Sequence, residues 1–267
     1  MNRIAERFAE LQKKGEKALI TFATAGDPDE QTSADILVEL AGAGADIIEV
    51  GIPFSDPLAD GSSIQSSTLR ALSMGMTPNK SLELIAHVRS IVDVPIVLMT
   101  YYNPVQRMGL ERFAELAAKS GADGVIITDL PPEEAHDWKK AADAQGICTI
   151  FLLAPTSTDS RIKIVAEMAE GFIYCVSRTG VTGAREEVSA EVSELVRRVK
   201  AFTNKPAAVG FGISKPEHVR DVCSYADAAV VGSAIVDLAA EYKDSDNLLP
   251  KIAAFTRELK HATMPTY

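Results

Sequence analysis

Cysteine, histidine and long apolar runs are scarce or missing in this sequence, and each absence excludes a class of protein. The three cysteines (Cys148, Cys175 and Cys223) are too few and too unevenly spaced for a fully paired disulfide framework, which suits a reducing compartment. The four histidines are scattered, with no spacing that resembles a metal site. No apolar run reaches the ~18 residues that a membrane-spanning helix needs. We therefore expect a soluble, cytoplasmic protein without a metal site.

Positive charge is also in short supply. The chain has 27 Lys and Arg against 37 Asp and Glu, which gives a formal net charge of −10. An acidic chain without a basic run is poorly suited to bind nucleic acid or an anionic membrane. We expect any anionic ligand to be held by local backbone donors, because the overall field opposes it. The Gly-Lys pair of a phosphate loop is missing as well.

What the sequence does contain is a regular succession of eight short apolar runs. Each is rich in Ile, Val or Phe and apolar on both faces, which is typical of parallel strands covered by helices, and helix-period segments lie between them. This alternation predicts a single-domain (β/α)8 TIM barrel over residues 1–267. An open doubly wound sheet is the alternative, but no Gly-x-Gly-x-x-Gly turn follows the first run. The runs cover residues 18–24, 46–52, 94–100, 123–128, 147–154, 172–177, 206–211 and 227–232.

An internal repeat and two long connections refine this prediction. Gly-Ala-Asp precedes an apolar run at residues 44–46 and 121–123, and Ala-Asp does so at 226–227, so a helix end, a corner and a buried strand recur. The intervals between successive runs are longest after the second and the sixth. Extra residues after a barrel strand usually build the active-site face, so we expect long loops after strands 2 and 6 there.

The N-terminal segment predicts a helix in addition to the barrel. Ile4, Phe8 and Leu11 fall on one helical face between charged residues, which is the pattern of an amphipathic helix and not of a secretory signal. At the other end, residues 248–262 predict a closing helix.

A carboxylate interrupts the second apolar run. By strand parity Ile47, Glu49 and Gly51 share one face, while Ile48 and Val50 point the other way. If the aliphatic pair packs on the helices, Glu49 points into the mouth of the barrel. A carboxyl desolvated there has a raised pKa and can transfer protons near neutral pH. A structural carboxylate paired with a buried cation is the alternative.

The segment that follows Glu49 is polar and stiff. Residues 53–61 hold two acids, two prolines and a glycine. Asp56 and Asp60 could be simple turn-forming residues. Because the loop leaves the strand that carries Glu49, however, a functional role is favoured.

Glycine-rich turns follow the last three runs, at residues 177–183, 210–214 and 232–235. Late loops of such barrels, together with a helix N-terminus, are where phosphate is bound through backbone N–H groups, and glycine lets the backbone approach the anion. Two such turns after strands 7 and 8 predict a phosphate site.

Together these segments resemble the α subunit of tryptophan synthase along essentially the whole chain. In that family the enzyme cleaves indole-3-glycerol phosphate to indole and glyceraldehyde 3-phosphate by a retro-aldol reaction without a cofactor. The indole passes to a β subunit that bears pyridoxal phosphate. The resemblance implies a lyase of tryptophan biosynthesis in an α2β2 complex. It rests on the segments ITFATAGDP, ADIIEVGIPFSDPLADG, TYYNP, VSRTGVTG, VGFGIS and VVGSAIV.

The resemblance also implies the roles of individual residues. Glu49 would be the general acid–base and Asp60 would hold the indole N–H, while Thr182 would meet Asp60 when the loops close. The other substrate-binding residues would be Phe22 and Tyr174 along the pocket, and Gly183, Phe211, Gly212, Gly232 and Ser233 around the phosphate.

The two long loops further suggest a docking surface. Because both loops lie at the open end of the barrel, we expect the β subunit to contact Phe54, Asp56 and Pro57 and to favour closure. One departure from the family is that Ser62-Ser63 follows Gly61, where a proline is common, and this bears on the stiffness of the first loop.

Three other functions remain open at this point. Another phosphate-binding barrel is one, although a Schiff-base aldolase needs a lysine inside a strand and a metal aldolase needs clustered histidines. A catalytically silent barrel that only binds a partner is the second. A stand-alone lyase that uses the same chemistry and releases free indole is the third.

Overall fold

Parallel strands form the centre of the structure, a computed structural model that describes residues 2–176, 185–210 and 212–265. The strands are β1 (Ala18–Thr24), β2 (Ile47–Gly51), β3 (Ile96–Thr100), β4 (Gly124–Ile127), β5 (Cys148–Ile150), β6 (Leu152–Leu153), β7 (Ile173–Val176), β8 (Ala207–Gly210) and β9 (Ala228–Val231). They form one sheet in the order β5-β4-β3-β2-β1-β9-β8-β7-β6, in which all pairs are parallel.

The two edges of this sheet belong to the same stretch of chain. β5 pairs with β4 and β6 pairs with β7, and Phe151 alone separates β5 from β6. The sheet therefore closes on itself as a barrel of eight strands, one of which is interrupted at Phe151. Each of the eight apolar runs contains its strand, so the predicted (β/α)8 class is confirmed.

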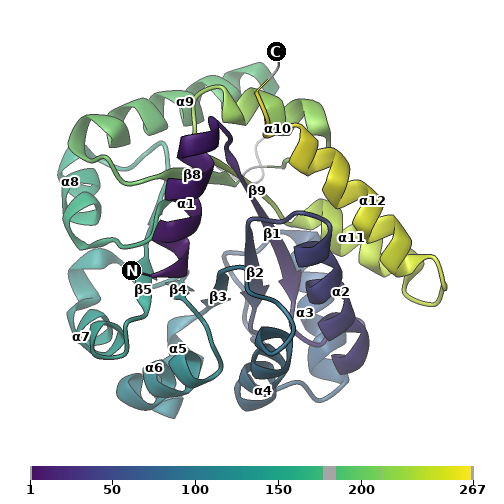
Figure 1. Cartoon of the computed structure of the whole chain (residues 1–267). Coiled ribbons are helices and arrows are strands. Elements are labelled where there is room, and N and C mark those ends of the chain that lie inside the picture. The colour runs from purple at the N-terminus through teal and green to yellow at the C-terminus, as the bar shows by residue number, and fades with distance from the viewer. Residues whose placement is uncertain (1, 177–184, 211, 266–267) are drawn as a thin grey trace.

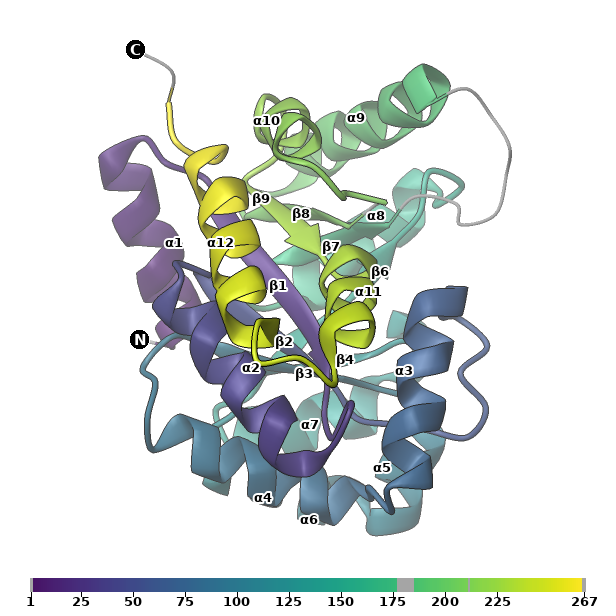
Figure 2. The same cartoon turned by 90° about the vertical axis from the view of Figure 1, so that its right-hand side faces the viewer.

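Helices surround the strands, as Figure 1 shows. They are α1 (Arg3–Lys14), α2 (Glu30–Gly42), α3 (Ser62–Ser73), α4 (Pro78–Arg89), α5 (Tyr102–Met108), α6 (Leu110–Lys119), the 3-10 helix η1 (Pro132–Glu134), α7 (His136–Ala144), α8 (Asp159–Met168), α9 (Arg185–Phe202), α10 (Pro216–Cys223), α11 (Ser233–Tyr242) and α12 (Leu248–His261). The N-terminal part of the chain (purple) and the C-terminal part (yellow) meet at β1 in Figure 2. There α12 packs between α2 and α11, and all three helices contact β1. None of the helices in the described ranges is long and apolar enough to cross a membrane.

Buried residues form two cores, one on each side of the barrel wall. Ile48 and Val50 pack outwards among residues of the surrounding helices, whereas Ile47 packs inside with Ile20 and Val97 from the neighbouring strands. This alternation confirms the strand parity that directs Glu49 into the barrel.

The predicted N-terminal helix is present as α1, and it closes the N-terminal end of the barrel. Its Ile4, Phe8 and Leu11 are buried in the inner core, and the helix crosses in front of the strands in Figure 1. Asn2 begins the helix by accepting a hydrogen bond from the N–H of Ile4, and Gly15 ends it in the left-handed conformation, with φ at 69°.

The repeated aspartates fix this end of the barrel. Each accepts a hydrogen bond from a backbone N–H where the neighbouring strand begins: Asp46 from Leu19 at 2.7 Å, Asp123 from Ile96 at 2.9 Å and Asp227 from Ala207 at 3.1 Å. Each also forms ion pairs, and three of these tether α1 and the residues after it. The pairs are Arg7–Asp46 at 2.6 Å, Arg3–Asp123 at 3.1 Å and Lys17–Asp227 at 3.2 Å. The repeated aspartates therefore have a structural role, because they join neighbouring strands to one another and to α1.

The long connections predicted after the second and sixth apolar runs follow β2 and β7. After β2, a loop over residues 52–61 leads into the helix α3, so much of the extra length is helical. Ser62 is the first residue of α3, which places the Ser62-Ser63 departure in a helical turn where proline is also tolerated. The connection after β7 covers residues 177–184, and these lie outside the described part of the chain.

Candidate active site at the mouth of the barrel

Glu49 lies in the middle of β2 with its side chain inside the barrel. The residue is 1% exposed, and its Oε2 has no hydrogen-bond partner among the described residues. Burial raises the pKa of Glu49 to about 8, and the nearby charge of Asp60 raises it as well. The carboxyl group is therefore mostly protonated at neutral pH, which allows it to donate a proton.

Asp60 lies at the end of the loop that leaves β2. Two backbone hydrogen bonds between residues close in sequence form turns in this loop. The N–H of Leu58 donates to the carbonyl of Asp56, and the N–H of Asp60 donates to the carbonyl of Pro57. Burial raises the pKa of Asp60 to about 6, while a hydrogen bond with Tyr101 acts in the opposite direction. At neutral pH Asp60 is thus mostly ionised, and the two neighbouring carboxyl groups differ in protonation state.

Tyr101 is a site residue that the sequence reasoning noted only within the TYYNP segment. Its hydroxyl accepts a hydrogen bond from the N–H of Ala59 at 3.0 Å, and its ring lies 5.3 Å from the ring of Phe54. The signal that could have found it is positional. Tyr101 follows β3, the parallel neighbour of β2, so it emerges beside the loop that carries Asp60.

Phe22 and Tyr174, both expected to bind substrate, each lie over a glycine of a neighbouring strand. Phe22 on β1 is in register with Glu49, and its ring would lie 2.7 Å from a Cβ atom at Gly51. The Tyr174 ring covers Gly210 in the same way. A larger residue at either glycine would displace an aromatic ring. Burial and the charges of Glu49 and Asp60 raise the pKa of Tyr174, so its hydroxyl stays neutral.

The glycine-rich turns at the ends of β8 and β9 lie next to each other, because Gly210 pairs with Val230. Gly212 has φ at 39° and open space where a Cβ atom would be. Gly232 immediately precedes α11, and Ser233 is the first residue of that helix. The first N–H groups of a helix have no partner within the helix and attract anions. The remaining expected substrate residues, Thr182, Gly183 and Phe211, lie outside the described residues.

The expected partner-binding residues belong to the same loop as Asp60. Phe54 and Pro57 are half-buried and Asp56 is exposed. Phe54 also borders a groove of about 500 Å³, together with Asn103, Pro104 and Arg107.

Cavity size does not identify this site. Phe22, Phe54, Asp60 and Tyr101 line only a small cavity, to which Ile64 and Thr68 of α3 also contribute, two residues that the sequence reasoning missed. A larger pocket of about 740 Å³ lies at the opposite end of the barrel, beside α1.

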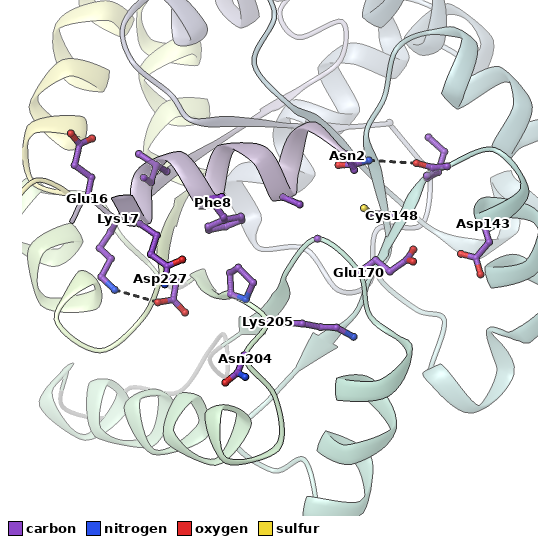
Figure 3. A pocket seen from close by; sticks show the side chains of 18 residues that line it. Asn2, Phe8, Glu16, Lys17, Asp143, Cys148, Glu170, Asn204, Lys205 and Asp227 are labelled. Atoms are coloured by element: carbon purple, nitrogen blue, oxygen red, sulfur yellow. Dashed lines mark hydrogen bonds and ion pairs between the residues drawn. The ribbon is translucent and has the colours of Figure 1, made fainter. Parts of the chain in front are cut away.

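Figure 3 shows this larger pocket, with Phe8 of α1 over it and Lys17 bound to Asp227 at its side. Its ionic groups pair with protein groups: Lys205 donates to the carbonyl of Ala166 at 2.7 Å, and Glu170 pairs with Lys139. The paired carboxyl groups at the mouth identify the candidate site better than volume does. In the described ranges, no group of three or more His, Cys, Asp or Glu side chains is arranged to hold a metal ion.

The fold places the chain among (β/α)8-barrel proteins, and two carboxyl groups of different protonation state at its mouth can donate and accept protons. A family model described as "Tryptophan synthase alpha chain" matches residues 8–264. The alpha chain of Geotalea uraniireducens is 50% identical over 260 residues, covering 97% of each chain, and that of Geobacter sulfurreducens is 50% identical over 262 residues, covering 98% of this chain and 99% of the relative.

Solved structures agree with these relatives. Tryptophan synthase subunit alpha from Legionella pneumophila aligns with a TM-score of 0.91 at 34% identity, covering 98% of both chains. A chain of tryptophan synthase from M. tuberculosis aligns with a TM-score of 0.91 at 35% identity, covering 100% of both chains. The chain belongs to the tryptophan synthase alpha chain family. It is a lyase of tryptophan biosynthesis, and the comparisons do not favour the stand-alone lyase.

Proposed function

We propose that the chain binds indole-3-glycerol phosphate at the mouth of the barrel and cleaves it to indole and glyceraldehyde 3-phosphate, with Glu49 as general acid–base. The observation that carries this proposal is the pair of carboxyl groups with different protonation states, Glu49 with a pKa of about 8 and Asp60 with a pKa of about 6.

The first step is proton transfer to the indole ring. Breaking the carbon–carbon bond directly would leave an unstable carbanion at C3 of indole. Protonated Glu49 therefore donates its proton to C3, and positive charge develops on the ring nitrogen. Ionised Asp60 accepts a hydrogen bond from the ring N–H and offsets this charge, which is worth most in a site that excludes water.

The second step returns the proton to Glu49. Its carboxylate, now ionised, removes the proton from the hydroxyl group on the side-chain carbon attached to C3. The C–O double bond of the aldehyde forms as the carbon–carbon bond breaks, and the electron pair of that bond restores the aromatic ring. Glu49 ends protonated as it began, so atoms and electrons balance without a cofactor.

The substrate phosphate is held by the turn containing Gly212 and by the start of α11 at Gly232 and Ser233. The adjacency of β8 and β9 and the free N–H groups expected at a helix start support this placement. Phe22 and Tyr174 form walls for the indole ring. Thr182, Gly183 and Phe211 complete the expected set, and their roles rest on the family resemblance.

The partner is a β subunit that docks beside the loop of residues 52–61. Leu58 is 92% exposed at the tip of this loop, and the groove beside Phe54 is bordered by the cationic Arg107. The exposed side chain of Leu58 and the groove beside Phe54 belong to one loop, and together they are the surface on which we place the partner. The complex is α2β2 and cytoplasmic.

The test is release of indole from indole-3-glycerol phosphate by the purified chain, alone and with increasing β subunit. We expect slow basal cleavage and stimulation that saturates at one β chain per α chain. Leu58→Ser should weaken the stimulation and leave the basal rate unchanged, while Leu69→Ser, on the exposed part of α3, serves as a matched control. No cleavage under any condition would refute the proposed activity, and full activity alone, indifferent to β subunit, would point to the stand-alone lyase.

A further inference from the structure

We propose that Tyr101 is the positioning residue of this site, and that its hydroxyl group holds the Asp60 carboxylate in the orientation in which it meets the substrate. This inference rests on the proposed role of Asp60.

The backbone around Tyr101 is fixed on both sides. The carbonyl of Met99 accepts a hydrogen bond from the N–H of Ile52 at 2.9 Å, and that of Thr100 accepts one from Thr128 at 2.9 Å. Tyr101 itself is 6% exposed, and its ring packs against Phe54 at 5.3 Å. Because the backbone before Tyr101 is hydrogen-bonded on both sides and the ring packs against Phe54, the position of the hydroxyl is fixed.

The hydroxyl of Tyr101 lies beside the backbone and the side chain of the loop that carries Asp60. It accepts a hydrogen bond from the N–H of Ala59, the residue before Asp60, at 3.0 Å, and Tyr101 and Asp60 line the same small cavity. An ionised carboxylate only accepts hydrogen bonds, so in the proposed arrangement the hydroxyl of Tyr101 is the donor and Asp60 is the acceptor. One side chain thereby fixes both the backbone before Asp60 and its carboxylate, while its ring contacts Phe54 earlier in the same loop.

This arrangement has a consequence for the ionisation of Asp60. The groups that interact with the Asp60 charge among the described residues are Glu49 on β2, Tyr101 after β3 and Tyr174 on β7. Of these, Tyr101 donates the hydrogen bond that opposes the effect of burial on the pKa of Asp60. We therefore expect loss of the hydroxyl to raise the pKa of Asp60 above about 6 and to leave less Asp60 ionised at any given pH near that value.

The experiment compares Tyr101→Phe with Tyr102→Phe, which removes the same hydroxyl from the next residue in the chain. The pH dependence of kcat/KM is measured for both variants, and the Asp60 carboxyl is titrated by ¹³C NMR in protein labelled at aspartate, with its signal assigned from Asp60→Asn. For Tyr101→Phe we expect the acid limb and the NMR pKa to rise together by about one pH unit, as for loss of a hydrogen bond to a charged group. The alkaline limb should stay in place, and Tyr102→Phe should change neither quantity.

Two results separate the possible failures. An Asp60 titration that is the same in Tyr101→Phe and the wild type refutes the positioning role, whatever the activity shows. A shifted titration with an unchanged acid limb means that Tyr101 does bind Asp60 but that Asp60 is not needed in ionised form, which overturns the proposed function of Asp60 and the inference that rests on it.

Discussion

Raising the pH from 7 to 9 should remove most of the lyase activity, because it deprotonates the group that starts the reaction. Burial keeps the pKa of Glu49 at about 8, and the proposed reaction starts from its protonated form. Such a group is about 90% protonated at pH 7 and about 10% at pH 9, so kcat/KM should fall about ninefold on this limb.

Lowering the pH should act through the other carboxyl group. Asp60 has a pKa of about 6 and is needed ionised, so its contribution is present above that pH and lost below it. The ionised fraction falls from about 90% at pH 7 to about 10% at pH 5, which predicts a fall of similar size. The profile is therefore a bell with its maximum near pH 7.

The assay is the initial rate of glyceraldehyde 3-phosphate formation at substrate concentrations well below KM, from pH 5 to 9.5. Asp60→Asn should lose the acid limb while the alkaline limb remains, which assigns each limb to its residue. Circular dichroism at both extremes of pH is the control that checks whether the protein stays folded. A rate that continues to rise up to pH 9 would refute the reasoning, because the ionised form of Glu49 would then begin the reaction.

The remaining predictions concern single residues. Glu49→Gln should lower kcat by at least ~10²-fold while glycerol 3-phosphate binds as before, and retention of a tenth of the turnover would exclude Glu49 as the catalyst. Because the folded state raises the pKa of Glu49, its stability cost appears above pH ~4.5 and grows as the pH rises to about 8. Glu49→Gln should thus raise the melting temperature at pH 8 but not at pH 4. Gly232→Asp places a carboxylate at the start of α11 and should raise both KM and the inhibition constant of glycerol 3-phosphate, and unchanged constants would move the phosphate site elsewhere. Asp46→Ala should destabilise the fold by about 3–5 kcal/mol in urea unfolding, since it leaves the buried Lys260 without this partner, whereas Asp93→Ala, which removes an exposed carboxylate, should cost under ~1 kcal/mol.

Local sequence patterns were enough to predict the strands and the direction of Glu49. Burial on both faces of a strand leaves a continuous apolar run, and the period of two then fixes which side chains enter the barrel. The β1 strand has the predicted bounds, Ala18–Thr24, and the other strands fall inside their runs. The interruption at Phe151 was not predicted, since the run over 147–154 is continuous in composition although its two parts pair with different neighbours.

Contacts made across loops were the part that the sequence could not supply. Tyr101 meets Ala59 and Phe54 although more than forty residues separate them in sequence, and no local period encodes such a meeting. The helix α3 was likewise missed inside the long connection after β2. Its sequence SSIQSSTLRALS is rich in serine, and such residues compete for backbone hydrogen bonds and weaken the helical signal.

Buried aspartates at the N-terminal end of the barrel and the two carboxyl groups of the candidate site have opposite surroundings, and this difference separates stability from chemistry. At the N-terminal end, burial would raise the pKa of Asp227, but the N–H of Ala207 and the ammonium groups of Lys200 and Lys17 outweigh it, so the pKa ends below its ordinary value. At the mouth, neither Glu49 nor Asp60 forms an ion pair with any described residue, and the pKa of each is raised. An aspartate held by cations cannot exchange protons near pH 7, whereas a desolvated carboxyl without a cation can. Basic side chains therefore pair with the aspartates that fix the N-terminal end of the barrel, and in the described residues none pairs with the two carboxyl groups to which we assign proton transfer.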